Sequence, residues 1–393
     1  MFTLSRIDSS FGPSPKKIKC IVFIAGMLAL NYNARCQEPV RGVQPASKKI
    51  YTAFPFLLIN PDARTGGMGD VGVSLPDDRN SMADNPSKMI FLEERNGFSL
   101  SYSPYLKSLA NGISLAYLSG YFRLSDNKSL GASLKYLSFG RVEITSAEMQ
   151  RLGSFNPSEA AFDISYAQSF GENFSMALAM RYVTSGGRYS LASSNTSDRE
   201  SSGIGADVSA FFKCESNLFG EEGLFSMGLN ITNIGPKIRY SEIAKEFLPT
   251  NLRLGGTFLI PVQELNRVIF SIEINKLMVP SGSALGTLDP DVRSNTESVP
   301  GAILSSFTDA PGGFSEELSE LSIASGIEFS FNKVLALRGG YFYESPQKGF
   351  RRYFTLGTGL RIKNIDLDLA YIAASPQNNP LANTLRFSLG LKI

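Results

Sequence analysis

The sequence predicts an all-β protein, a 14-stranded antiparallel transmembrane β-barrel of the bacterial outer membrane with an N-terminal hatch that plugs its lumen. Three observations lead to this fold class. Residues 95–393 divide into runs of about ten residues in which apolar and polar side chains alternate. Long and short connections alternate between these runs. A glycine- and proline-rich stretch, residues 56–94, precedes the first run and has the pattern of neither a strand nor a long helix.

The first 36 residues have the features of a secretory signal peptide. Three lysines between positions 16 and 19 precede an apolar run, residues 20–30, that is too short to span a bilayer. Ala34 and Cys36 are small residues just before a cut at Gln37. We therefore expect export, with residues 37–55 as a periplasmic N-terminal segment. After this cut Cys214 is the only cysteine left, so no intramolecular disulfide is expected.

The composition argues against most enzyme and nucleic-acid-binding designs. The chain contains no histidine, which removes the usual general base of Ser-His-Asp and Cys-His sites and the commonest zinc ligand. Its 38 basic and 36 acidic residues give a net charge of +2, with no long run of either sign, so nucleic acid is not expected as a partner. We predict no enzymatic activity, no cofactor and no metal site.

The alternating runs have the length of tilted membrane-spanning strands. In residues 174–183, large apolar side chains alternate with small or charged ones, so that one face is apolar. The predicted strands are residues 98–102, 113–122, 129–138, 161–170, 174–183, 203–212, 224–233, 251–260, 267–276, 319–331, 334–343, 353–362, 365–374 and 383–393.

Alternation alone does not show whether the apolar faces form a dry core or contact lipid, but the connections do. Odd-numbered strands are followed mostly by long connections, including residues 139–160, 184–202, 234–250 and 277–318. Even-numbered strands are followed mostly by short ones, including residues 171–173, 261–266, 332–333 and 363–364. Outer-membrane barrels place tight turns in the periplasm and long loops outside. The apolar faces are therefore predicted to face lipid, and both chain termini to be periplasmic.

The polar faces of these strands are then predicted to face the lumen, where charges are tolerated because they are solvated or paired. The predicted lumen charges are Lys135, Asp163, Arg181, Asp207, Arg253, Glu273, Glu328, Arg338, Arg361, Asp366, Asp368 and Arg386.

The stretch 56–94 contains glycines spaced as in a dinucleotide-binding motif, at positions 67, 69 and 72. That motif needs a buried strand before it and a helix after it, whereas Asn60-Pro61 precedes these glycines and Pro76 follows them. We interpret them as positions of close packing or positive φ in a segment that starts on the periplasmic side and fills the barrel. A short helix is predicted within residues 80–89, interrupted at Asn85-Pro86. The predicted hatch residues are Gly66, Gly67, Gly69, Asp70, Gly72, Asn85 and Pro86.

An N-terminal hatch with Asn-Pro before a 14-stranded barrel resembles the FadL superfamily of outer-membrane proteins. Residues 60–89, NPDARTGGMGDVGVSLPDDRNSMADNPSKM, resemble more narrowly the hatch of the PorV (LptO) family of the type IX secretion system. Residues 152–167, 309–318, 337–360 and 379–391 match the same family in the same order. The chain departs from the family at Asp84 and Ser87, where a tryptophan and an alanine are usual, and at Ile393, where an aromatic residue is common.

The resemblance implies a non-enzymatic shuttle in the outer membrane, in contact with its lipid. Proteins of this family bind the C-terminal signal domain of secreted cargo as it leaves the SprA-like translocon, and carry it to the PorU-containing attachment complex. Two other functions stay open. One is a FadL-type channel for hydrophobic compounds, and the other is a lipid-A-modifying enzyme, for which the sequence offers no convincing pair of catalytic groups.

The cargo- and partner-binding surface is expected on the long outer loops, where aromatic residues lie beside glycine and proline turns. These aromatic residues have an alternative role, which is to fold the loops back over the barrel mouth. The candidate residues are Phe139, Arg141, Phe155, Asn156, Pro157, Phe307, Pro311 and Phe314.

Overall fold

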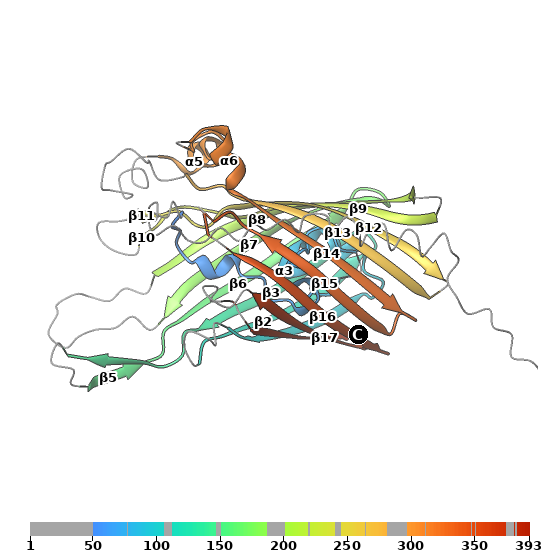
Figure 1. The fold of residues 1–393 in the computed structure, drawn as a ribbon, viewed down its shortest axis with the longest axis horizontal. Helices are drawn as coiled ribbons and strands as arrows, with labels where there is room; N and C mark the ends of the chain where they lie inside the picture. Colours follow the sequence, from blue (N-terminus) through green and yellow to red (C-terminus); the bar gives the residue numbers. More distant parts are fainter. Residues whose placement is uncertain are drawn as a thin grey trace, which may run out of the picture. The chain divides into compact units, whose positions relative to one another are not determined.

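Fourteen antiparallel strands form a closed barrel, as the sequence predicts (Figure 1). Each strand pairs with its sequence neighbours, and the last strand pairs with the first. The barrel strands are β1 (Asn96–Pro104), β2 (Ser114–Ser125), β3 (Lys128–Ser138), β6 (Ser158–Ser169), β7 (Phe174–Gly186), β8 (Ser201–Leu218), β9 (Glu221–Ile234), β12 (Asn251–Gln263), β13 (Asn266–Leu277), β14 (Leu321–Phe331), β15 (Leu335–Tyr343), β16 (Arg352–Ile362), β17 (Ile365–Ala374) and β18 (Thr384–Lys392).

The computed structural model describes part of the chain, and the elements belong to the unit Ser47–Ile393. The described residues are 50–393 except 77, 106–111, 147–150, 187–200, 219–220, 240–244, 264, 281–296, 311, 347, 350, 375–380 and 382. The predicted signal peptide, residues 1–36, and candidate residue Pro311 lie outside them. Within the described residues, no helix has the length and apolar character needed to cross a membrane.

The apolar faces of the strands point outward. On β7, Leu178 and Met180 are 61% and 75% exposed, whereas the alternate residues Ala177 and Ala179 are 3% and 4% exposed. The same alternation follows β1, β3 and β18. All the charged residues predicted to face the lumen are buried or half-buried. The barrel thus has the apolar exterior and polar interior that the loop parity predicts.

Short and long connections lie at opposite ends of the barrel. Turns of two to four residues join β2 to β3, β6 to β7, β14 to β15 and β16 to β17 at the short-turn end. The opposite, long-loop end carries elements that the sequence analysis does not predict (Figure 1). These are the hairpins β4 (Val142–Thr145) with β5 (Arg151–Phe155) and β10 (Ile238–Arg239) with β11 (Lys245–Glu246), and the helices α5 (Val299–Ser305) and α6 (Phe314–Ser319).

Residues 53–92, called here the internal segment, lie inside the barrel. The segment is almost entirely buried, and its polar groups contact inward-facing side chains of strands all around the wall. Asn85-Pro86 separates its third and fourth helices, as the sequence predicts. Its helices are η1 (Pro55–Leu58), α2 (Ala63–Gly66), α3 (Ser81–Asp84) and η2 (Pro86–Phe91).

The internal segment runs from the long-loop end to the short-turn end. At its start, the Ala53 backbone N–H donates to the Phe247 carbonyl (2.8 Å), and Ile50 packs against a cluster that includes Ala302 of α5. At its end, Glu94 pairs with Lys392 at the end of β18. For residues 50–55 this corrects the predicted start on the periplasmic, short-turn side. The alternation pattern has no information about the direction of an irregular segment.

Candidate functional site

Buried ion pairs hold the internal segment to the wall. Arg64 of α2 pairs with Glu328 of β14 (Nε to Oε2, 3.0 Å), and Asp84 of α3 pairs with Arg253 of β12 (2.9 Å). Asp70 pairs with Arg386 of β18 in the same way. Removing one partner of such a pair weakens the compensation of a buried charge, which makes the loss costly. The internal segment is therefore fixed to strands on different sides of the barrel.

Backbone groups of the internal segment also form hydrogen bonds with side chains of the wall. The N–H groups of Gly72 and Val73 both donate to Glu273 Oε2 (2.8 and 2.9 Å). Lys135 Nζ on β3 donates to the carbonyls of Leu57 and Ile59 (3.1 and 2.7 Å). These bonds satisfy polar groups that no helix or sheet of the segment satisfies, which a buried irregular segment requires.

The predicted hatch glycines lie where the segment touches the wall. A Cβ on Gly67 would lie 2.9 Å from the Cα of Gly357 on β16. Gly69 has φ +76°, and its N–H donates to Thr355 Oγ1 (2.8 Å). A side chain at either position would push the segment away from the wall. The backbone at these glycines therefore lies in close contact with the wall.

The internal segment also bonds to both strands of the closing seam. Asn80 Nδ2 donates to Ser101 Oγ on β1 (3.3 Å), and Ala63 N–H donates to Ser388 Oγ on β18 (2.9 Å). Ser388 Oγ in turn donates to Asp62 Oδ1 (3.0 Å). The two serines, which are within hydrogen-bond distance of each other (2.7 Å), join the segment to the first and last strands together.

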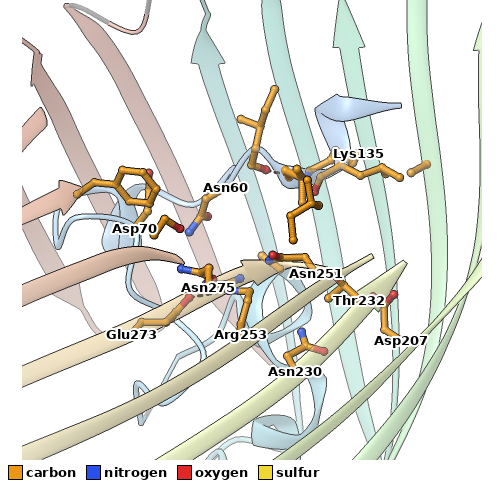
Figure 2. Close-up of a pocket in the computed structure, with 18 of the residues that line it drawn as sticks. Asn60, Asp70, Lys135, Asp207, Asn230, Thr232, Asn251, Arg253, Glu273 and Asn275 are labelled. Carbon is orange, nitrogen blue, oxygen red and sulfur yellow. Dashed lines mark hydrogen bonds and ion pairs between the residues drawn. The ribbon is translucent and has the colours of Figure 1, made fainter. Parts of the chain in front are cut away.

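A polar cavity of about 160 Å³ lies between the internal segment and the long-loop end of the wall (Figure 2). Asn60 of the segment and Arg253, Glu273 and Asn275 of the wall point into it. The cavity reaches the long-loop ends of the strands, where Leu277 lines it. Its polar lining suits hydrogen-bonding groups better than a hydrocarbon.

Arg181 and Arg253, which line this cavity, each pair with carboxylates. Arg181 donates to Asp163 (Nε to Oδ1, 2.5 Å) and to Asp207 (Nη2 to Oδ2, 3.0 Å). Arg253 donates to Glu273 (Nε to Oε1, 2.6 Å) in addition to Asp84. Each guanidinium thus faces two carboxylates, and the wall does not present an isolated charge at these positions.

Helix α6 is anchored to the barrel mouth by its charged face. Lys276 Nζ at the end of β13 donates to Glu317 and Glu320 (3.0 and 2.8 Å). Lys348 Nζ, in the connection from β15 to β16, donates to Glu316 and Glu320 (3.0 and 2.8 Å). Burial by itself lowers the pKa of the Lys348 ammonium, but the hydrogen bonds to Glu320 and Glu316 outweigh it and raise this pKa above its usual value.

The opposite face of α6 is apolar and exposed. Phe314 is 79% exposed and Leu318, one helical turn later, is 52% exposed. Leu304 of α5 and Phe307 after it are 74% and 44% exposed. We call these four residues the α5–α6 patch. Here the charged side of a helix faces the protein and the apolar side faces outward, which is the reverse of an ordinary surface helix.

The other predicted binding loop lies between β3 and β6. The Phe139 N–H donates to the Pro157 carbonyl (3.0 Å), which draws the two ends of the loop together. Arg141 Nε donates to Ser154 Oγ (3.0 Å) across the base of the β4–β5 hairpin. Asn156 is exposed, and Phe155 ends β5. These residues come from a different loop than Phe307 and Phe314.

Part of the α5–α6 patch and the groups that anchor it are not predicted from the sequence. These are Leu304, Leu318 and the buried carboxylates of α6. A signal is present in residues 314–320, because Phe314 and Leu318 are spaced by four residues while the three glutamates fall on the other side of a helix. The partners Lys276 and Lys348 lie far away in the sequence, so no local pattern connects them.

The acidic groups near α6 bring three carboxylates close together. Single oxygens of Asp309, Glu317 and Glu320 lie within 4.8 Å of one another. The ammonium group of Lys276 bonds to two of these residues, so a cation is already present at the cluster. We assign no metal to it.

Comparison with known proteins gives one family match. Residues 43–284 match the family model described as type IX secretion system protein PorV. No curated protein sequence matches the chain significantly.

The solved structures that resemble this chain include two toluene transporters and a FadL homologue. The toluene transporter TbuX of Ralstonia pickettii is 12% identical, with a TM-score of 0.47 over 87% of this chain and 100% of that one. The toluene transporter TodX of Pseudomonas putida is 12% identical, with a TM-score of 0.47 over 83% and 95%. A FadL homologue of Pseudomonas aeruginosa is 10% identical, with a TM-score of 0.45 over 85% and 98%.

Proposed function

Because this chain belongs to the PorV family of type IX secretion system proteins, we propose that it is a non-enzymatic outer-membrane shuttle for secreted cargo. In this role it binds the C-terminal signal domain of cargo that leaves the SprA-like translocon. It then delivers the cargo to the PorU-containing attachment complex at the cell surface. Family membership supports a role in type IX secretion, and the details of this shuttle are our proposal.

The observation that carries the proposal is the α5–α6 patch. Phe314 and Leu318 are exposed on a helix whose other face is tied to the barrel by Lys276 and Lys348. Large apolar side chains held in place before binding contribute contact area at a low cost in conformational entropy. An exposed apolar surface of this kind is typical of a protein–protein contact. The patch is therefore our choice for the cargo-binding surface, with the β3–β6 loop as a second contact.

The internal segment supports a binding role over a transport role. A FadL-type channel for hydrophobic compounds, the alternative function, requires an apolar passage between this segment and the wall. The cavity at the long-loop end is lined instead by residues such as Arg181, Arg253 and Asn275. Ion pairs such as Arg64–Glu328 fasten the segment on the other side. Uptake of a fatty acid or a monoaromatic compound into proteoliposomes that contain this protein would favour the alternative.

Co-purification from native membranes tests the proposal. A protein tagged in an outer loop is expected to retain secreted proteins with intact C-terminal signal domains when outer membranes are dissolved in a mild detergent. Recovery of no such protein would contradict the shuttle function.

Quantitative binding then tests the surface. The double variant Phe314→Ala, Leu318→Ala is expected to bind a purified C-terminal signal domain roughly tenfold or more weakly than the natural protein. The matched control is Phe170→Ala, which removes a ring that is 56% exposed at the short-turn end. Equal affinity of all three proteins would exclude the α5–α6 patch as the cargo-binding surface.

A further inference from the structure

Three neighbouring strands bring polar side chains together on one wall of the cavity. The pairing register places Asn230 of β9 opposite Arg253 of β12, and Arg253 opposite Asn275 of β13. One step closer to the long-loop end, Thr232 lies opposite Asn251. All five side chains line the cavity (Figure 2). We call Asn230, Thr232, Asn251 and Asn275 the amide wall.

The amide wall has hydrogen-bonding capacity that the described protein does not use. Asn230 is 2% exposed, and its Oδ1 has no hydrogen-bond partner within the described part of the chain, whereas its Nδ2 donates to the Asp84 carbonyl (2.7 Å). This bond fixes which end of the amide is the free acceptor. The side chains of Asn251 and Asn275 are half-buried and line the same cavity. A buried polar atom without a partner is costly, and a bound group that donates to it removes that cost.

The chemistry of the wall selects a neutral ligand. Arg253, in the middle of the wall, is already paired with Asp84 and Glu273. The groups that remain are carboxamides and a hydroxyl, which offer both donors and acceptors. The free volume of about 160 Å³ is close to that of engineered cavities that hold one benzene molecule. The cavity therefore has room for one or two small chemical groups of a larger ligand.

We propose that the amide wall binds the main chain of an extended segment of secreted cargo that enters the barrel mouth. Side-chain carboxamides carry the same donor and acceptor as a peptide group, so the two pair readily. Residues two apart on one strand, such as Asn230 and Thr232, are separated by about 6.8 Å, which is also the repeat of equivalent groups in an extended peptide. The proposal rests on the shuttle function and adds a second contact, below the α5–α6 patch, that recognises backbone instead of apolar side chains.

Two variants and one cross-linking position test this inference. In the double variant Asn251→Leu, Asn275→Leu, the side chains keep a similar shape but lose their amides. It is expected to bind a purified C-terminal signal domain about tenfold more weakly, because two or more hydrogen bonds are lost. The control Asn217→Leu changes an exposed asparagine at the end of β8 and is expected to leave the affinity unchanged. A photo-reactive amino acid at position 275 is expected to cross-link to the cargo domain.

The outcomes separate this inference from the proposed function. If the natural protein binds the domain, but the double variant binds equally well and no cross-link forms at position 275, the amide wall is not a cargo site and the shuttle function stands. If the natural protein does not bind the domain at all, both proposals fail. A cross-link to a polysaccharide in place of the domain would show that the wall is a carbohydrate site, which also overturns the inference. Equal circular dichroism spectra of all variants establish that each protein is folded.

Discussion

Arg64 of the internal segment and Glu328 of the barrel wall form an ion pair in which both side chains are at most 4% exposed. Glu328 also accepts a hydrogen bond from Arg338 of β15 (Nε to Oε2, 2.6 Å). One carboxylate therefore neutralises two guanidinium groups, one from the segment and one from the wall. Arg338 has a second carboxylate partner in Asp368.

This arrangement predicts which of two substitutions, at Glu328 or at Arg64, destabilises the protein more. Glu328→Gln removes the carboxylate that Arg64 and Arg338 share and is expected to cost about 3–5 kcal/mol of stability. Arg64→Met is expected to cost less, because Glu328 keeps Arg338. The measurement is the temperature at which the detergent-solubilised protein loses its β-sheet circular dichroism, with Glu215→Gln at an exposed position as the control. A larger effect of Arg64→Met would show that the carboxylate does not serve both cations.

Close packing of the internal segment on β15 predicts a strong effect of one added methyl group. A Cβ on Gly340 would overlap the backbone of Met68 and Gly69. Gly340→Ala is expected to destabilise the barrel by about 1–3 kcal/mol or to stop its assembly. In Gly256→Ala, the new methyl group meets its nearest neighbour at 3.9 Å, and a normal yield of folded protein is expected. The measurement is the fraction of folded, heat-modifiable protein in outer membranes.

The ion pairs that anchor α6 through Lys348 are expected to be lost at alkaline pH. The pKa of Lys348 is raised above its ordinary value of 10.5 by Glu316 and Glu320. Its contribution is therefore complete below pH 10.5 and is lost as the pH rises through the higher folded-state value. The chain contains no tryptophan, so Phe314→Trp provides a single fluorescent reporter whose anisotropy falls when α6 is released.

The control for this titration is Lys348→Arg, measured with the same reporter. Arginine stays charged well above pH 12, so the release is expected to move to higher pH. Lys276, which shares Glu320 with Lys348, is present in both proteins, so the difference between the two curves reports on position 348. Identical curves would mean that Lys348 does not hold α6.

Because the apolar faces are exposed, the loss of stability caused by an arginine on them is expected to depend on its depth in the membrane. Leu178→Arg places a charge on the outer face of β7, where the side chain is 61% exposed, and is expected to cost about 2–4 kcal/mol near the middle of the bilayer. Phe170→Arg, at the short-turn end, is expected to cost about 0–1 kcal/mol. Unfolding by guanidinium chloride in lipid vesicles measures both variants. Equal costs would contradict a lipid-facing position for Leu178.

The path of the internal segment predicts an accessible residue on the cell surface. Tyr51 is 71% exposed near the long-loop end, and Ile393 is 70% exposed at the short-turn end. In a Cys214→Ser background, Tyr51→Cys is expected to react with a membrane-impermeant maleimide in intact cells. Ile393→Cys is expected to react only after the outer membrane is permeabilised. The reverse pattern would place the long loops in the periplasm.

The sequence predicts the barrel well because its physical signal is local. Alternation with period two and the lengths of the connections are readable without any knowledge of tertiary contacts, and both are confirmed. The direction of the internal segment is not predicted correctly for residues 50–55, because it depends on contacts such as Ala53 with Phe247, nearly two hundred residues away in the chain.

The candidate site is predictable only in part. Phe307 and Phe314 are named because aromatic residues beside glycine turns are visible in the sequence. That Glu316, Glu317 and Glu320 would be buried is not visible, because their partners come from β13 and from the connection after β15. The amide wall is not predicted either, since it depends on the register of β9, β12 and β13.

The bonds across the seam also set an order for biogenesis. Residues 53–92 precede β1 in the chain, yet they are joined to Ser101 on the first strand and to Ser388 on the last one. A cylinder that had already closed would leave no route by which such a fully enclosed peptide could enter sideways. We therefore expect the N-terminal portion to be seated while the sheet is still open, so that the final strand pairing completes the enclosure around it.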